Sequence, residues 1–376
     1  MNISFYMPFK PPGHANPSGD LITGMELHDY LIREGHRVAL ASTLRSRWIY
    51  WKPQGLWQAL GEARRLRAEL KPNPPDLWLS YHSYYKAPDL LGPACAAKLQ
   101  VPYVIFQGIY ATKHRKRLKT LPGFLLNRRA LEAANLVFAN KKKDLLNLRR
   151  LLREDRICYI APGLQPNHFA FDQTSRDQIR QQWQAGTRKV VLCTAMFRPG
   201  VKSEGIQIVI DSCARLRQQG CNILLVVIGD GKNHSLLERD GLQKLGPDCL
   251  FTGRIPRREL YRYYSAADVF AFPGIQESLG MVYLEAQSTG LPVVAYRDWG
   301  ASEAVVDKET GLLTPFAQPE QFGEAIKTIL THDETRAAMR QAAANHVRET
   351  HDSSKNYRLM TEILSNTVRN HPSHLT

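Results

Sequence analysis

Hydrophobic and polar positions alternate along this chain in a way that predicts strands and helices in regular succession. Apolar residues from Leu21 to Ile32 recur at helical spacing, and Gly35 stands where a glycine commonly ends a helix. The strands predicted in the first half are residues 2–8, 37–41, 76–80, 102–107, 136–139 and 157–160. This alternation predicts βαβ units and a mostly parallel sheet.

The pattern is interrupted at residues 161–173, where Pro162, Gly163 and Pro166 indicate a loop. A second series follows, with strands predicted at residues 189–194, 222–228, 249–252, 268–272 and 292–296 and closing helices at 333–350 and 353–369. We therefore predict an α/β protein with two doubly wound, Rossmann-like domains facing a central cleft. The predicted parts are a domain of residues 1–165, a domain of residues 174–350 and a C-terminal helix of residues 351–376 that packs back on the first domain.

Length and composition disfavour a disordered protein, a membrane-spanning protein and a protein held together by zinc or disulfides. The length of 376 residues suits two domains, and a hydrophobic content of 43% excludes wholesale disorder. No apolar run approaches the roughly 20 residues that a membrane-spanning helix needs, and the N-terminus reads as a strand rather than a signal peptide. Six scattered cysteines without a CxxC pair disfavour a zinc site or a disulfide framework. We expect a cytoplasmic protein.

The net charge of +15 is concentrated in one segment. Between residues 111 and 156, fourteen basic residues stand against four acidic ones, which is two thirds of the whole excess. Such a segment predicts an anionic partner, whether nucleic acid, a membrane surface or a phosphorylated ligand.

Residues able to carry chemistry follow several of the predicted strands. His82 comes after the strand of residues 76–80, where a histidine can act as a general acid or base or bind a hydroxyl, although a lone histidine is more often structural. Arg198 and Lys202 follow the first strand of the second half. Two cations at that position suit a diphosphate, whose leaving-group charge they could stabilise.

The densest signal lies between residues 273 and 286. A strand ends at Phe272, a loop presents Glu277, and the free N–H groups of a helix starting near Gly280 suit phosphate. Glu285 lies eight residues after Glu277. Within one helix this spacing separates two carboxylates by roughly 12 Å, so we predict separate tasks for them rather than the close pair of a glycosidase.

Several pieces of the second half, in order, resemble the family 4 glycosyltransferases, which have the GT-B fold. The pieces are the strand and Gly-Asp-Gly turn of residues 225–231, the turn of residues 251–255, the stretch of residues 264–270, the EX7E pair Glu277 and Glu285, and the closing pattern with Gly300, Glu303, Gly311 and Leu312. The resemblance covers nearly the whole chain and is strongest from residue 190 to residue 315. Ser18 departs from the family, because a glycine usually precedes the glycine matched by Gly19.

The resemblance implies a role for individual residues. Its implied catalytic residues are His82 near the transferred sugar, Glu277 at the reaction centre, and Arg198 and Lys202 at the diphosphate. Its implied donor-binding residues are Gly19, Gly229, Ile255, Ser278, Leu279, Gly280, Met281 and Glu285, with Glu285 holding the ribose hydroxyls and Ile255 meeting the base through its backbone. No Asp-x-Asp occurs, which fits a metal-independent enzyme without a cofactor.

The resemblance implies a retaining glycosyltransferase that moves a hexose from a UDP- or GDP-sugar to an acceptor hydroxyl. The expected setting is synthesis of cell-surface polysaccharide, lipopolysaccharide or glycolipid, with a glycan or lipid-linked acceptor. The first half combines bases with tryptophans, which suits peripheral attachment to an anionic membrane on its inner face. The candidate membrane or acceptor residues are Trp48, Trp51, Lys113, Arg115, Lys116 and Arg117.

Other functions stay open on the sequence. A nucleotide-sugar 2-epimerase of the same fold would need no acceptor. A nucleic-acid-binding protein would use the basic segment, but only Phe124 and Phe138 interleave its bases, which disfavours stacking on single strands, so no nucleic-acid partner is expected. An inactive sugar-nucleotide sensor is disfavoured because both Glu277 and Glu285 are present.

Overall fold

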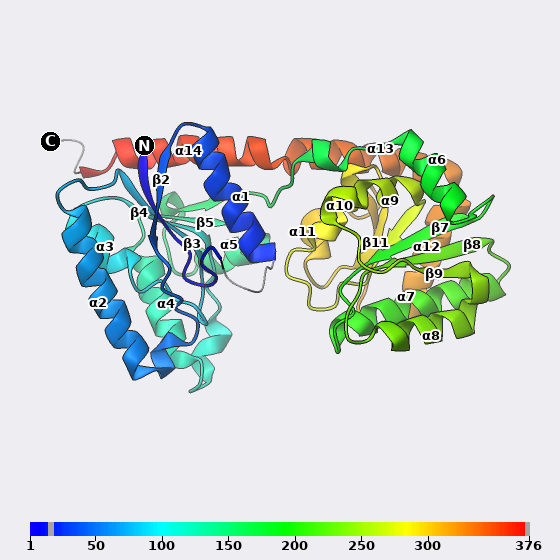
Figure 1. Cartoon of the computed structure of the whole chain (residues 1–376), viewed down its shortest axis with the longest axis horizontal. Coiled ribbons are helices and arrows are strands. Elements are labelled where there is room, and N and C mark those ends of the chain that lie inside the picture. The colour runs from blue at the N-terminus through cyan, green and yellow to red at the C-terminus, as the bar shows by residue number, and fades with distance from the viewer. Residues whose placement is uncertain (14–18, 373–376) are drawn as a thin grey trace. The chain divides into compact units, whose positions relative to one another are not determined.

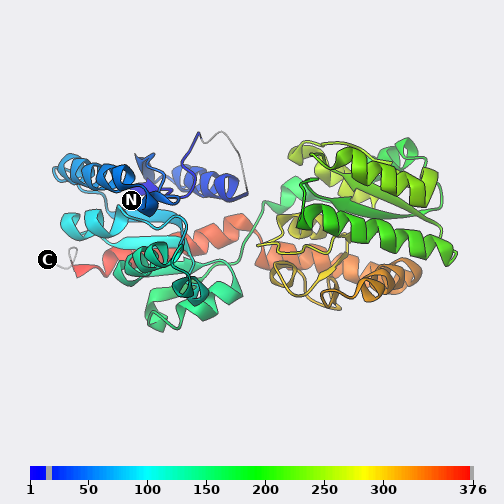
Figure 2. The same ribbon diagram turned by 90° about the horizontal axis from the view of Figure 1, so that it is seen from below.

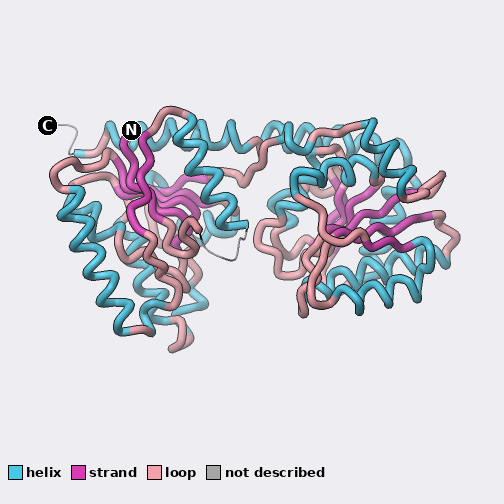
Figure 3. Tube along the Cα trace, in the orientation of Figure 1, coloured by secondary structure: helices cyan, strands magenta, loops and turns pink. Residues whose placement is uncertain are grey.

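The computed structural model describes residues 1–13 and 19–372 and contains two compact units. One consists of Met1–Ala161 with Ser354–Thr376, and the other of Pro162–Ser353. Each unit has a six-stranded parallel sheet between layers of helices (Figures 1 and 3). The predicted α/β class with two doubly wound sheets is confirmed.

The first unit carries the strand order β2-β1-β3-β4-β5-β6. Its strands are β1 (Asn2–Tyr6), β2 (Arg37–Ser42), β3 (Leu77–Ser83), β4 (Tyr103–Gly108), β5 (Leu136–Ala139) and β6 (Ile157–Tyr159). Its helices are α1 (Gly19–Arg33), α2 (Pro53–Leu70), α3 (Gly92–Leu99), α4 (Leu121–Ala133), α5 (Lys142–Leu148) and α14 (Ser353–Arg369), with short 3-10 turns η1 (Ile49–Trp51), η2 (Thr112–Lys116) and η3 (Glu154–Arg156).

Helix α14 belongs to the core of the first unit although it comes last in the sequence. Figure 2 shows it, in red, running among the elements of that unit. Its apolar face buries Tyr357, Met360 and Leu364 against strand residues such as Phe5 and Leu79. Alternate residues of the same strands face α2, α3 and α4 in a separate apolar cluster. The sheet is therefore covered on both faces, as buried parallel strands require.

The second unit has the strand order β12-β11-β10-β7-β8-β9. Its strands are β7 (Lys189–Thr194), β8 (Ile223–Ile228), β9 (Cys249–Phe251), β10 (Val269–Ala271), β11 (Val293–Tyr296) and β12 (Gly311–Thr314). Its helices are α6 (Gln173–Gln182), α7 (Val201–Gln218), α8 (His234–Leu245), α9 (Leu260–Ala266), α10 (Met281–Ser288), α11 (Ala301–Ala304), α12 (Pro319–Thr331) and α13 (Asp333–Thr350), with η4 (Pro166–Phe169), η5 (Gly246–Asp248) and η6 (Arg257–Glu259).

Strand β3 is longer than the sequence predicts. The predicted strand ends at Ser80 and places His82 in the following loop, whereas the observed strand continues to Ser83 and includes His82. Pairing with β4 joins Tyr81 to Phe106 and Ser83 to Gly108 and skips His82. His82 has a φ of 64°, so the backbone of the strand is locally left-handed there while the register with β4 is kept, which a hydrophobic pattern does not reveal.

No helix in the described part of the chain is both long enough and apolar enough to cross a bilayer.

Candidate active site

The loop after β10 is shaped by one buried aromatic side chain. Tyr283, on α10, passes beneath the loop and donates its hydroxyl to the carbonyl of Phe272 at 3.1 Å. A Cβ at Gly274 would lie 1.9 Å from the Tyr283 oxygen, and a Cβ at Gly280 would lie 2.3 Å from its ring. Both glycines also have φ near +67°. The glycines therefore let the loop close over Tyr283 and hold Glu277 at the carboxyl edge of the sheet.

Glu277 forms an ion pair with Lys202, which lies in the first turn of α7 after β7. The Lys202 ammonium also lies 5.2 Å from the centre of the Phe272 ring. Burial, together with the nearby charge of Arg198, lowers the pKa of Lys202 to about 8. Strands β7 and β10 are neighbours, so their following loops bring together two residues 75 positions apart.

The structure places the remaining predicted phosphate ligands around this pair. Arg198 is exposed on the loop that precedes α7, and its carbonyl accepts a hydrogen bond from the Ser203 hydroxyl at 2.7 Å. The N–H of Ser278 points to the Glu277 carboxylate at 3.4 Å. Helix α10 begins at Met281, directly after Gly280 and Leu279. The site thus gathers two cations and a helix N-terminus, which together suit a diphosphate.

Glu285 is separated from Glu277 by its partners as well as by its position. Glu277 precedes α10, whereas Glu285 lies in the second turn and is only 4% exposed. Arg257 donates to one carboxylate oxygen of Glu285 at 2.7 Å, and the Tyr264 hydroxyl donates to the other at 3.3 Å. Each glutamate therefore has its own set of neighbours.

Gly229 supports the site through close packing. A Cβ there would lie 1.8 Å from the carbonyl oxygen of Ala195, and its φ of 145° is one that side chains rarely adopt. Its N–H donates to the carbonyl of Gly253 at 2.9 Å. Gly229 thus holds the loop after β7 against the loop after β9 that carries Ile255, which is half-buried against the core.

In the first unit, His82 lies at the carboxyl edge of β3, where its Nδ1 is 3.2 Å from a carboxylate oxygen of Asp20. Burial would raise the pKa of Asp20, but its interaction with His82 and the charges of nearby lysines hold it below the ordinary value. The imidazole also packs against the rings of Phe9, at 5.3 Å, and Tyr84, at 4.8 Å.

Gln107 is a candidate site residue that the sequence pattern did not reveal. It lies on β4 at the position opposite His82, and both residues have left-handed backbone, with φ of 62° and 64°. Its side chain is 6% exposed, and its Oε1 has no hydrogen-bond partner among the described residues. Strained backbone at two adjacent strand ends is typical of functional sites. A polar residue directly before Gly108 was the only sequence signal.

Gly19 begins α1, beside Asp20. Ser18, where the sequence departs from the family pattern, and the residues back to position 14 lie outside the described residues.

The structure brings the tryptophans near residue 50 close to the basic segment that begins at residue 111. Trp51 donates its ring N–H to the carbonyl of Lys119 at 3.0 Å, and Trp48 packs against Tyr85, which in turn stacks on His114 at 3.5 Å. The four predicted cations are all exposed, and they are Lys113, Arg115, Lys116 and Arg117. Large apolar side chains are exposed nearby in the chain, with Leu118 at 84% and Trp57 at 70%.

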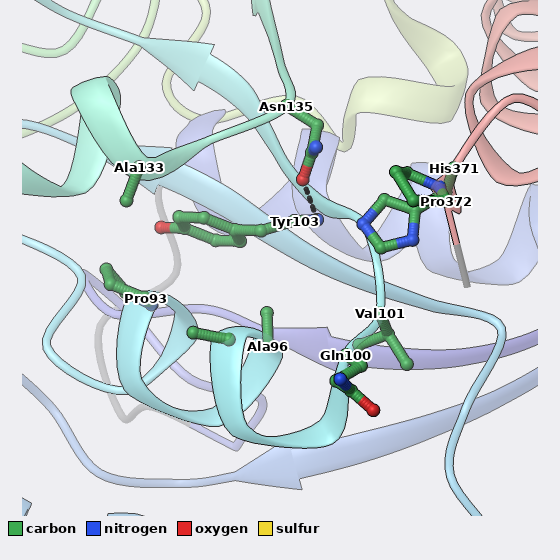
Figure 4. A pocket seen from close by; sticks show the side chains of 10 residues that line it. Pro93, Ala96, Gln100, Val101, Tyr103, Ala133, Asn135, His371 and Pro372 are labelled. Carbon is green, nitrogen blue, oxygen red and sulfur yellow. Dashed lines mark hydrogen bonds between the residues drawn. The ribbon is translucent and has the colours of Figure 1, made fainter.

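A pocket of about 560 Å³ lies at the opposite, amino-terminal edge of the first sheet (Figure 4). It is lined by Val101 and Tyr103 around the start of β4, by Asn135 before β5, and by His371, which follows α14. Because it lies away from the strand ends that carry His82 and Gln107, it is separate from the candidate site. In the described ranges, no group of three or more His, Cys, Asp or Glu side chains is arranged to hold a metal ion.

Comparison with known proteins finds sequence similarity to glycosyltransferases over part of the chain. Residues 175–346 match the family described as glycosyl transferases group 1. A GDP-mannose-dependent alpha-(1-6)-phosphatidylinositol monomannoside mannosyltransferase of Mycolicibacterium smegmatis is 33% identical over 196 residues, which are 50% of this chain and 50% of that protein. A D-inositol 3-phosphate glycosyltransferase of Corynebacterium efficiens is 32% identical over 232 residues, 58% of this chain and 53% of that protein. The chain thus spans about half the length of the curated relatives it matches.

Solved structures match nearly the whole chain. Anabaena Alr3699/HepE in complex with UDP has a TM-score of 0.76 at 19% identity and covers 97% of this chain and 100% of its own. Sucrose-phosphate synthase of Thermosynechococcus elongatus has a TM-score of 0.74 at 18% identity and covers 97% and 99%. At such identities the likeness concerns the fold. Residues 175–346 are therefore similar in sequence to the group 1 glycosyl transferases, and the chain as a whole has the GT-B fold that its motifs imply.

Proposed function

We propose that this protein is a glycosyltransferase that moves a hexose from a UDP- or GDP-sugar to an acceptor hydroxyl. The observation that carries the proposal is the pairing of Lys202 with Glu277 beside the N-terminus of α10, with Glu285 buried further along the same helix. A cation at a helix N-terminus suits the charge that develops on a departing diphosphate. The UDP bound to HepE and the GDP-mannose dependence of the mycobacterial relative support a nucleotide-sugar donor.

The proposed reaction retains the anomeric configuration and needs no metal. In it, Arg198 and Lys202 balance the charge of the leaving group. Within the first unit, His82 and Gln107 are the candidate residues for binding hydroxyl groups. Because Glu277 is paired with a cation, a role in orienting the donor sugar is favoured over nucleophilic attack. We therefore propose that the acceptor attacks the face of the sugar from which the diphosphate leaves, without a covalent enzyme intermediate. Trapping a glycosyl adduct on Glu277 would contradict this mechanism.

Donor binding is tested first, because a ligand that binds only the native state raises the melting temperature. We expect UDP or GDP, or one of their sugars, to stabilise the wild-type protein, and Lys202→Met to remove most of that shift. Lys232→Met is a matched control, because Lys232 is an exposed lysine of the same unit in the turn after β8. A nucleotide shift that is equal in all three proteins would refute the proposed donor site. Hydrolysis or epimerisation of the donor without any acceptor would favour the 2-epimerase instead.

We further propose that the first unit binds an anionic membrane, where a lipid-linked acceptor would be presented. Exposed Trp51, Trp57 and Leu118 stand among exposed cations, and this combination suits the interface of a bilayer. Each basic residue near an anionic surface contributes roughly 1 kcal/mol. Lys116→Gln with Arg117→Gln should therefore weaken binding to phosphatidylglycerol vesicles by about 30-fold.

The matched control for the apolar contribution is Leu236→Ala. Leu236 is an exposed apolar side chain on a helix, as Trp57 is on α2, but it lies on α8 of the second unit. We expect Trp57→Ala to reduce vesicle co-sedimentation and Leu236→Ala to leave it unchanged. Absence of binding at low salt, or equal effects of the two variants, would contradict membrane attachment through this surface.

A further inference from the structure

The carboxylate of Glu285 is held by two side chains from two other elements. Arg257, on η6, donates to Oε1 at 2.7 Å, and Tyr264, on α9, donates its hydroxyl to Oε2 at 3.3 Å. Because each donor bonds to a different oxygen, the two contacts together fix the plane of the carboxylate. Tyr264 is itself 1% exposed and cannot turn away without repacking the core.

Arg257 is held in place independently of Glu285. Its guanidinium carbon lies 5.5 Å from the centre of the ring of Phe169, which is buried in η4. Its side chain is 38% exposed, whereas that of Glu285 is 5% exposed, so Arg257 stands between the carboxylate and solvent.

We propose that Arg257 is a positioning residue that keeps Glu285 ionised and oriented to accept hydrogen bonds from the ribose hydroxyls of the donor. This inference rests on the proposed function. A carboxylate buried without a cation favours its neutral form, which exchanges an acceptor for a donor. With Arg257 in place, the carboxylate stays acceptor-only and can bind vicinal hydroxyls through charge-assisted hydrogen bonds.

Arg258 provides a matched control on the same turn. It carries the same charge, but its side chain is 87% exposed, and its contact with Glu259 is a long one of 3.8 Å. Removal of either arginine changes the net charge of the protein equally. Only removal of Arg257 should affect the recognition of ribose.

The test is calorimetric titration with UDP and GDP and with their 2′,3′-dideoxy analogues. For whichever nucleotide binds, we expect Arg257→Met to weaken the ribonucleotide about tenfold and the dideoxy analogue less than twofold, since a hydrogen bond to a charged group is worth about that much. Arg258→Met should change neither by more than twofold. Arg257→Lys should recover part of the loss. Thermal melting of each variant shows that it is folded.

A double-mutant cycle isolates the contact. In the Glu285→Gln background, Arg257→Met should have no further effect on ribonucleotide affinity, because its action passes through the carboxylate. Equal weakening of the ribonucleotide and its dideoxy analogue would overturn the inference, as would additive losses. Tighter binding by Arg257→Met would also overturn it, since Arg257 would then compete with ribose. A wild-type protein that binds neither UDP nor GDP would refute the proposed donor site itself. If the wild-type protein binds a nucleotide but Arg257→Met weakens the ribonucleotide no more than its dideoxy analogue, only the positioning role of Arg257 is refuted.

Discussion

Lys202 makes donor binding depend on pH in the alkaline range. Burial and the charge of Arg198 lower its pKa to about 8, against an ordinary value of 10.5. A bound diphosphate favours the charged ammonium and raises its pKa again, so binding takes up a proton wherever the free lysine is neutral. The affinity is then full below pH 8 and falls as the pH rises above it. If the bound pKa returns to its ordinary value, the loss is about tenfold between pH 7 and pH 9.

The assay is titration of a UDP- or GDP-sugar, whose diphosphate has no proton to lose in this range. Lys202→Arg keeps a permanent charge and should give an affinity that is flat between pH 7 and pH 9. Lys202→Met should be weak and equally flat. A wild-type affinity that does not change over this range would refute the reasoning, and so would the same decline in Lys202→Arg, because the titrating group would then lie elsewhere.

Three further predictions concern stability. Gly274→Ala should cost about 2–4 kcal/mol in chemical unfolding, since its Cβ would meet the Tyr283 oxygen, whereas Gly61→Ala, with open space around it in α2, should be neutral or stabilising. Met360→Ala, in the buried face of α14, should cost about 2–5 kcal/mol. Burial raises the pKa of Asp268, but the Val190 N–H and two arginine partners outweigh it and lower the pKa overall. The contribution of ionised Asp268 to the free energy of unfolding is therefore present above the ordinary carboxyl pKa and is lost as the pH falls through the lowered pKa. Asp268→Asn should lower the free energy of unfolding by about 3–5 kcal/mol at neutral pH. Its acid unfolding should therefore occur at a higher pH than that of the wild-type protein.

Much of the fold follows from local patterns. The strands near residues 189–194 and 222–228 and the closing helices at 333–350 and 353–369 were predicted within a residue or two of their observed bounds. Helix α2 was not predicted, because its sequence mixes arginines, Gly61 and tryptophan on the exposed side and buries only small residues and Leu66. Weak amphipathic contrast of this kind leaves no clear periodic signal.

The left-handed backbone at His82 is not predicted for a different reason. The departure from regular strand geometry depends on β4, where Gln107 is distorted at the facing position. A feature produced by two strands at once cannot be seen in the pattern of either one. The importance of Gln107 therefore became visible only with its burial and its unpartnered oxygen.

The sequence by itself determined the alternation of strands and helices, the loop that carries Glu277, the place of Lys202 after the first strand of the second half, and the glycines that the Glu277 loop requires, because these depend on neighbouring residues. Only the tertiary structure decided which side chains pair with one another in the site. Lys202 meets Glu277 across 75 positions, and Arg257 meets Glu285 across 28, because strand order and helix packing bring their elements together. Such pairings depend on which elements become neighbours in space, and one-dimensional spacing carries no record of that choice.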